Sequence, residues 1–384
     1  MWLSDVRLVL ADRIIENGSL RIEAGVIAEI TEAPGIGTHT VYPGFIDMHG
    51  DMIEHELEPR PGVDFPMEVA VSHLDARLAA AGVTTAYAGV SFSRTANAGE
   101  RRSFEHTSGI IRALKDTIRD TRVDHRIHAR FDMTYTEAIA ALKGLLDAGA
   151  VDLVSVMDHT PGQGQYRNVE KLIAYRMKDG MTEEQARANI QHRIDDAVPA
   201  EQLLCNLQDV SRLCKPRGIA MASHDDDTVA KANLMADIGA VISEFPVTME
   251  AARTAADRGL MIAMGAPNAM RGRSYSGNLS ARDAHAAGLL HILAADYHPA
   301  AILPAIHALA AQDLDGLVGA VRLASANPAK ALGLDDRGEI AIGKRADLAI
   351  VDAKNRVTKT LLGGEVIFSN GTVPNVTEAT VRAA

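Results

Sequence analysis

Histidine and aspartate side chains recur directly after short apolar runs along this chain of 384 residues. His49 and Asp51 lie two residues apart after the first such run, and on an extended backbone both side chains project to the same side. Imidazole and carboxylate groups together suit a divalent metal ion, with zinc expected first and manganese or iron as alternatives. The pattern therefore predicts a site for one or two metal ions. The expected ligands are His49, Asp51, Asp132, His159, His224 and Asp296.

Each of these residues has a more ordinary explanation when it is taken alone, because a single histidine after a strand is more often a surface residue than a ligand. Their combination after five separate runs favours the metal site. The neighbours of His224, Asp225 to Asp227, are explained equally well as caps of a following helix. Asp47 either points toward the site or orients a ligand. The remaining histidines that we considered are interpreted as structural or supporting residues: His55, His125, His128, His285, His291 and His298.

The apolar runs that precede these residues alternate with longer amphipathic segments rich in alanine and leucine. Such alternation predicts repeated β–α units and a parallel sheet. Eight units fit a (β/α)8 barrel of the TIM type, in which catalytic groups project from the carboxyl ends of the strands. Counting alone leaves a flat, doubly wound sheet as the alternative. The expected strands span residues 41–48, 83–88, 127–133, 151–157, 219–223, 240–245, 260–264 and 291–295.

Both ends of the chain have a different pattern from the middle. Short β-like runs, separated by turns that contain glycine and asparagine, occupy residues 1–42 and 338–384. We expect these two segments to pair into one small β-sandwich domain beside a metal-binding barrel of residues 43–337. The longest insertion is 161–218, and its charged residues are expected to form a solvated helical face.

Composition limits the classes of partner. Hydrophobic residues make up 47% of the chain and charged residues 23%, which is typical of a soluble globular protein. A net charge of −11 and an aromatic content of 4% disfavour a nucleic-acid partner. Neither a secretion signal nor an apolar run of roughly 18 residues is present, and Cys205 and Cys214 give no sign of a disulfide. We therefore expect a cytoplasmic protein without a membrane partner, and we consider a homodimer as its assembly.

Two motifs carry a resemblance to a known family. Residues 43–51, Pro-Gly-Phe-Ile-Asp-Met-His-Gly-Asp, resemble the first-strand motif of the amidohydrolase superfamily, which usually contains His-x-His. Residues 327–334 and 338–348 are similar to the segment by which that superfamily leaves its barrel. A narrower resemblance links the chain to the branch that serves phosphonate utilisation in the carbon–phosphorus lyase pathway. Its motifs lie at residues 59–66, 153–163, 222–226, 265–268, 271–272, 276–278 and 296–297.

This resemblance implies a metal-dependent hydrolase that cleaves a phosphoanhydride of a phosphorylated sugar and releases pyrophosphate. It implies that Asp296 accepts a proton from the attacking water. Guanidinium groups grip phosphate in a bidentate manner, so two arginines are expected among the substrate contacts. The expected substrate-binding residues are Arg60, Gln163, Arg271, Ser276 and Asn278.

The chain departs from the wider superfamily at three points. Asp51 replaces the second histidine of the usual pair, and Asp132 stands where a longer bridging group is common. The strand count also places His159 and His224 one strand earlier than the usual order, so either the count is wrong or one of the two is not a ligand. These departures leave the number of metal ions open.

Two other functions compete with phosphoanhydride hydrolysis. The first is hydrolysis of a carbon–nitrogen bond in a cyclic amide, an N-acyl group or an amidine, although fold alone does not decide function. The second is a non-enzymatic assembly protein, which the intact ligand set disfavours. The motifs around Arg60 and Arg271 favour the phosphate substrate, because a neutral amide gives no reason for two cationic contacts.

Overall fold

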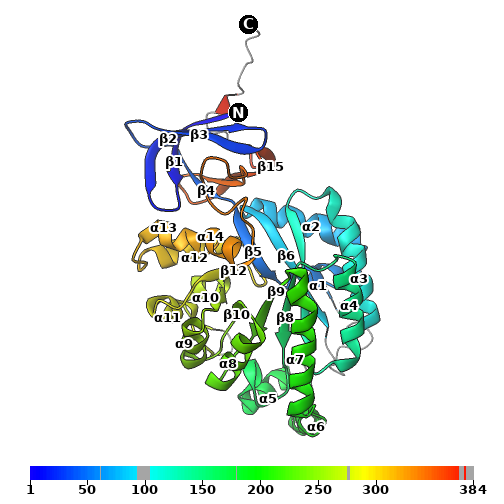
Figure 1. The fold of residues 1–384 in the computed structure, drawn as a ribbon. Helices are drawn as coiled ribbons and strands as arrows, with labels where there is room; N and C mark the ends of the chain where they lie inside the picture. The colour runs from blue at the N-terminus through cyan, green and yellow to red at the C-terminus, as the bar shows by residue number, and fades with distance from the viewer. Residues whose placement is uncertain (61, 93–103, 179, 275–276, 372–375, 378–384) are drawn as a thin grey trace.

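A parallel barrel lies beneath a small β-sheet in the computed structural model, which describes residues 1–60, 62–92, 104–178, 180–274, 277–371 and 376–377 (Figure 1). The barrel strands are hydrogen-bonded in their order along the chain, from the first to the eighth. This order confirms the expected (β/α)8 barrel and excludes the doubly wound sheet, in which the strand order reverses. The strands are β5 (Phe45–Gly50), β6 (Val83–Phe92), β7 (Asp124–Asp132), β8 (Leu153–Met157), β9 (Ala220–His224), β10 (Ile242–Glu244), β11 (Met261–Gly265) and β12 (Ile292–Ala294).

The barrel closes between its first and last strands at their carboxyl ends. The amide of Asp296 donates to the carbonyl of His49, and the amide of Asp51 donates to the carbonyl of Asp296, both at 2.9 Å. Two of the predicted ligand segments are thus joined by backbone hydrogen bonds although they lie almost 250 residues apart in the chain.

Helices surround the barrel on its outer face (Figure 1). Because parallel strands are covered on both faces, they are apolar along their whole length, and all ten residues of β6 are buried. The described helices are α1 (Met52–Leu57), α2 (Met67–Ala80), α3 (Phe104–Thr117), α4 (Ile139–Asp147), α5 (Val169–Lys178), α6 (Glu183–Asp195), α7 (Ala200–Cys214), α8 (Val229–Ile238), α9 (Met249–Asp257), α10 (Ala266–Arg271), α11 (Ala281–Ala286), α12 (Ile302–Ala310), α13 (Gly316–Arg322) and α14 (Ala326–Ala331). Within this part of the chain, no helix has both the length and the apolar character needed to cross a bilayer.

The two end segments pair into a single sheet, as expected. Its order is β15-β14-β13-β4-β1-β2-β3, with β16 on β1, and every pairing is antiparallel except that of β1 with β4. Leu348 and Ile350 pack into the sheet's own core, whereas the alternate residues Ala349 and Val351 pack against the barrel. The strands are β1 (Trp2–Val9), β2 (Ile14–Glu23), β3 (Val26–Glu32), β4 (His39–Pro43), β13 (Leu348–Val351), β14 (Val357–Leu362), β15 (Glu365–Ser369) and β16 (Val376–Thr377).

The run expected as one strand at 41–48 is two strands in the structure. β4 belongs to the small sheet and β5 begins the barrel, with Gly44 between them. A Cβ atom at Gly44 would lie 2.3 Å from the Oγ1 atom of Thr84, so only glycine fits where the chain passes from one sheet to the other.

Arg337 anchors the segment that leaves the barrel. Its guanidinium donates to Asp336, to the Oγ1 atom of Thr85 at 3.0 Å and to Asp124, near the amino ends of β6 and β7. The side chain is only 6% exposed. Removing it leaves the Asp124 carboxylate without this partner in a largely buried place, which is costly. We expect Arg337→Met to lower the free energy of unfolding by about 2–4 kcal/mol, measured by urea denaturation.

A matched variant controls for the loss of one arginine charge. Arg356 also pairs with an aspartate, Asp352, but its side chain is 60% exposed. Arg356→Met is therefore expected to change the free energy of unfolding by less than about 1 kcal/mol. Equal stability losses in the two variants would contradict the anchoring role of Arg337.

Candidate active site

Imidazole and carboxylate groups converge at the carboxyl ends of the barrel strands. His224 and Glu244 are the last residues of β9 and β10 and lie directly opposite each other in the strand pairing. His49, near the end of β5, places its Nδ1 atom 3.1 Å from the Oε2 atom of Glu244. One donor atom from each of these three buried residues lies within 4.8 Å of the others. This spacing allows all three to bind one cation.

An irregularity in β5 directs His49 inward. Ile46 and Met48 pack inside the barrel, and strict alternation would point His49 to the other face. The pairing of β5 with β6 shifts register between Asp47 and Gly50. Such a shift inserts a residue and re-aims the side chains beyond it, which accounts for the contact of His49 with Glu244.

Buried polar atoms without partners show that this donor set fits a cation. Within the described residues, the Oε1 atom of Glu244, both ring nitrogens of His224, the Nε2 atom of His159 and the Oδ2 atom of Asp225 are buried and make no hydrogen bond. Each such atom costs about 1–3 kcal/mol when it stays unsatisfied. A divalent ion held by imidazole nitrogens and carboxylate oxygens would satisfy them, which suits zinc, manganese or iron chemistry.

A second donor group adjoins the first and shares His224 with it. His159, His224 and Asp225 also bring donor atoms within 4.8 Å of one another. Burial lowers the pKa of His159 to about 3, so its imidazole is neutral and able to donate a lone pair. The eight-strand count was therefore right, and His159 lies beside His224 even though it follows the fourth strand. Asp225 does not cap α8, because the hydroxyl of Thr228 accepts the amide hydrogen bond there.

The charge of His49 shows how the metal-free centre is compensated. Burial opposes protonation of this imidazole, but the carboxylates of Glu244 and Asp51 outweigh it and raise its pKa to about 10. A proton on His49 thus supplies positive charge between two carboxylates where a cation would otherwise do so.

Asp51 pairs with an arginine that the sequence analysis did not consider. Its Oδ1 atom lies 3.3 Å from the Nε2 atom of His49 and also accepts from the guanidinium of Arg130 on β7. Burial opposes ionisation of Asp51, yet Arg130 outweighs it and the pKa of Asp51 falls below its usual range. Neither donor group contains Asp51.

Asp296 forms part of the cavity wall but belongs to neither donor group. Burial raises its pKa to about 6, and the nearby charge of Asp51 adds to the effect. Its backbone has a φ of +59°, a left-handed conformation that aspartate and asparagine tolerate better than most residues. A Cβ atom at Gly265 would lie 2.8 Å from its Oδ2 atom, so glycine at 265 leaves space for this carboxylate.

Asp132 lies apart from the other predicted ligands. It ends β7 as expected, but it lines a separate cavity of about 220 Å³ together with His159, Arg193 and Thr134. The amide and hydroxyl of Thr134 both donate to its Oδ1 atom. Asp132 is therefore already satisfied by hydrogen bonds, and neither donor group includes it.

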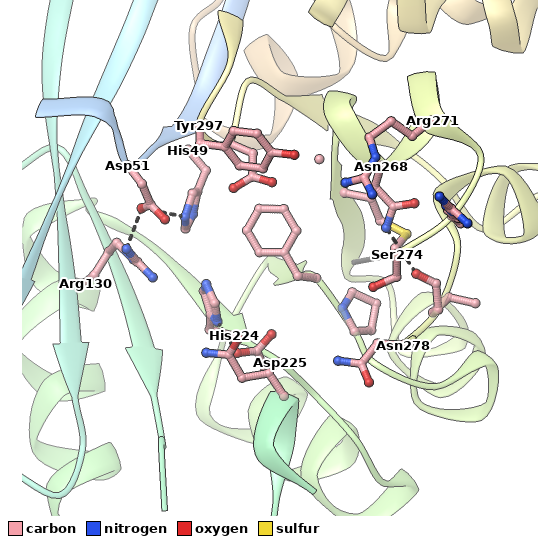
Figure 2. A pocket seen from close by; sticks show the side chains of 18 residues that line it. His49, Asp51, Arg130, His224, Asp225, Asn268, Arg271, Ser274, Asn278 and Tyr297 are labelled. Atoms are coloured by element: carbon pink, nitrogen blue, oxygen red, sulfur yellow. Dashed lines mark hydrogen bonds and ion pairs between the residues drawn. The ribbon is translucent and has the colours of Figure 1, made fainter. Parts of the chain in front are cut away.

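The main cavity has a volume of about 280 Å³ and two unlike walls. Figure 2 shows Arg130, Asp51 and His49 on one side and Arg271, Asn268, Ser274 and Asn278 on the other. Arg271 and Asn278 thus lie where substrate contacts were expected. Arg60 and Gln163 do not line this cavity, whereas Arg273 and Gln165 do, and Ser276 lies outside the described residues.

Three residues of the centre were missed by the sequence analysis, and a signal existed for two of them. Glu244 ends the sixth strand, so the same strand-end rule that selected His224 applies to it. Arg130 alternates with Asp132 on β7 and so projects to the same face. Asp225 was considered only as a helix cap, and no local pattern separated that role from metal binding.

These features define a hydrolase barrel with a metal centre at its strand ends, and comparisons with known proteins agree. A model of the amidohydrolase family matches residues 317–368. The chain belongs to the amidohydrolase family. It is 36% identical over 366 residues to the α-D-ribose 1-methylphosphonate 5-triphosphate diphosphatase of Escherichia coli K12, covering 92% of this chain and 96% of that protein.

Solved structures share the fold at low sequence identity. N-acetyl-D-glucosamine-6-phosphate deacetylase from Mycobacterium smegmatis is 16% identical with a TM-score of 0.64, covering 96% of this chain and 99% of the deacetylase. 5-Methylcytosine deaminase from Klebsiella pneumoniae is also 16% identical, with a TM-score of 0.66 and coverage of 98% and 99%. At such identity the likeness concerns the fold, which supports many reactions.

Proposed function

We propose that this protein hydrolyses α-D-ribose 1-methylphosphonate 5-triphosphate to the 5-phosphate and pyrophosphate. The Escherichia coli relative with this activity in its name supports the proposal through 36% identity over nearly the whole chain. The observation that carries it is the cavity itself, in which the donor groups face a wall that contains Arg271 and Arg273 (Figure 2). A neutral amide substrate would leave these two guanidinium groups without a purpose.

The side chains divide the work between binding and proton transfer. A divalent ion, when bound, would polarise a phosphoryl oxygen and lower the pKa of water. We assign zinc first, with manganese or iron as alternatives, to His49, His224 and Glu244 and to the adjoining His159 and Asp225.

Arg271 and Arg273 would neutralise the charge that spreads over the phosphate oxygens in the transition state. Both belong to the segment that follows β11, opposite the carboxylates. Asn268 holds this segment in place, because its side chain donates to the carbonyl of Leu279 and accepts from the amide of Ala281. The arginines are thereby presented by a braced loop, which limits the reorganisation needed during the reaction.

Asp296 would accept the proton of the attacking water. Its carboxylate lines the cavity and is held beside the donor groups by the backbone bonds that close the barrel. A general base must lie within hydrogen-bond reach of the proton it removes, and this position meets that requirement. In the same proposal the protein acts in the cytoplasm in phosphonate catabolism, on a small phosphorylated sugar and not on nucleic acid.

Phosphorus NMR of the reaction tests the proposal. The metal-loaded protein is expected to release pyrophosphate from the ribose triphosphate, with one pyrophosphate for each 5-phosphate formed. Release of orthophosphate alone, or no turnover with zinc, manganese or iron, would reject it. N-acetylglucosamine 6-phosphate and a cyclic amide serve as comparison substrates, and faster hydrolysis of either would favour carbon–nitrogen bond cleavage instead.

A further inference from the structure

A second, larger cavity adjoins the catalytic one. It has a volume of about 670 Å³ and shares Gln165, Ser274 and Asn278 with the catalytic cavity. Its far wall is formed by α5 and by the residues just before that helix. A ligand seated at the donor groups would therefore have room to extend past these three uncharged polar side chains.

The charge of this second cavity is uniformly positive. Arg167, Lys171 and Lys178 line it, and the described residues of its lining include no aspartate or glutamate. The catalytic cavity, in contrast, contains carboxylates, among them Asp51 and Asp296. This separation occurs in a chain with 50 acidic and 39 basic residues, so the local field opposes that of the whole protein.

The helix arranges its cationic residues along one face. Lys171, Tyr175 and Lys178 are spaced by four and three residues, which places them on the same side of α5 over a length of roughly 10 Å. Lys171 lies where the two cavities meet, because a Cβ atom at Gly277 would be 2.7 Å from its Nζ atom. Arg167 and Lys178 form no ion pair with any residue that the structure describes, so their charge is not already neutralised.

We propose that this second cavity binds a phosphonate or phosphate group at the end of the substrate remote from the cleaved bond. The inference rests on the proposed function, whose substrate carries a methylphosphonate on C1 of ribose and a triphosphate on C5. Arg271 and Arg273 serve the phosphates at the donor groups. Gln165, Ser274 and Asn278 match the sugar hydroxyls between the two ends, and the three cations of the second cavity bind the methylphosphonate.

A triple variant tests this subsite with two substrates. In Arg167→Met, Lys171→Met, Lys178→Met, kcat/KM for the ribose 1-methylphosphonate 5-triphosphate is expected to fall by about 10–100-fold, mainly through KM. For ribose 5-triphosphate with a free C1 hydroxyl, kcat/KM is expected to stay within about twofold, because this substrate has no anion to place there. An equal loss for both substrates, or no loss for either, would overturn the subsite.

A charge-matched variant excludes a general effect of net charge. Arg253→Met, Lys330→Met, Lys354→Met removes the same charge from exposed positions that line neither cavity. It is expected to leave the preference between the two substrates unchanged. If it reduces that preference as much as the first triple variant does, the local assignment fails.

Binding distinguishes failure of the subsite from failure of the proposed reaction. If the wild-type protein releases no pyrophosphate from either substrate, calorimetry with ribose 1-methylphosphonate 5-phosphate and ribose 5-phosphate still tests the cavity. A preference of the wild type for the first ligand that the triple variant loses would support the subsite while the reaction is rejected. Equal binding of the two ligands by the wild type would overturn the subsite.

Discussion

Replacing Glu244 with glutamine is expected to weaken metal binding by at least about 100-fold and to lower kcat/KM by about 1,000-fold or more. Glutamine has nearly the same shape as glutamate, and Glu244 is fully buried, so the fold should accept the change. The amide removes the negative charge that faces His49 and supplies a weaker metal donor. Metal content after dialysis, measured by elemental analysis, and activity across added metal concentrations check this result.

Asp75→Asn provides a matched control for the loss of a buried carboxylate. Asp75 on α2 accepts hydrogen bonds from the amides of Arg122 and Val123 and lies 3.0 Å from the Nε2 atom of His125, away from the donor groups. This variant should lose stability by about 1–3 kcal/mol and keep the wild-type metal content. A chelator should lower the melting temperature of the wild type and of Asp75→Asn but leave that of Glu244→Gln nearly unchanged. Wild-type metal affinity in Glu244→Gln would refute the donor group.

Replacing Asp296 with asparagine is expected to lower kcat by about 100- to 10,000-fold while the metal content stays the same. Asparagine tolerates the left-handed backbone that residue 296 adopts, so the closing hydrogen bonds of the barrel should persist. The amide cannot accept the proton of water, and this loss affects kcat more than KM. Steady-state kinetics combined with metal analysis checks both parts of the result.

A companion variant acts on the same carboxylate without changing it. Gly265 has an ordinary backbone conformation with φ of −70°, so alanine is strained there only by its contact with the Asp296 carboxylate. Gly265→Ala should displace that carboxylate and lower kcat by about tenfold or more, again with metal retained. If Asp296→Asn keeps full activity, or if it loses its metal, then Asp296 is not the base that we propose.

The strands and the residues at their ends could be predicted because their signals are local. A buried parallel strand needs a short apolar run, and the side chain that follows it must face the mouth of the barrel. Those two conditions located all eight barrel strands and brought His49 and His224 to the correct end. Glu244 satisfied them as well and was overlooked, so its absence from the expected ligands reflects incomplete use of the rule.

The partners of each side chain were decided only by the tertiary structure. His49 contacts Glu244 across 195 residues of sequence, and a register shift within β5 is what turns it inward. Asp51 looked like a ligand from its spacing, but Arg130 on another strand holds it. Asp132 sits at the end of its strand as expected, yet Thr134 satisfies it in a different cavity.

The substrate-facing loops show the same division. Arg60 and Gln163 were expected from motifs, but the main cavity takes Arg273 and Gln165 instead, because loop backbone geometry determines which residue points inward. Apolar periodicity is encoded within one segment, so the sequence alone determined the barrel, the small sheet and the strand ends that carry chemistry. Contacts between distant segments depend on register, bulges and loop paths, so only the folded chain decided which of those residues meet.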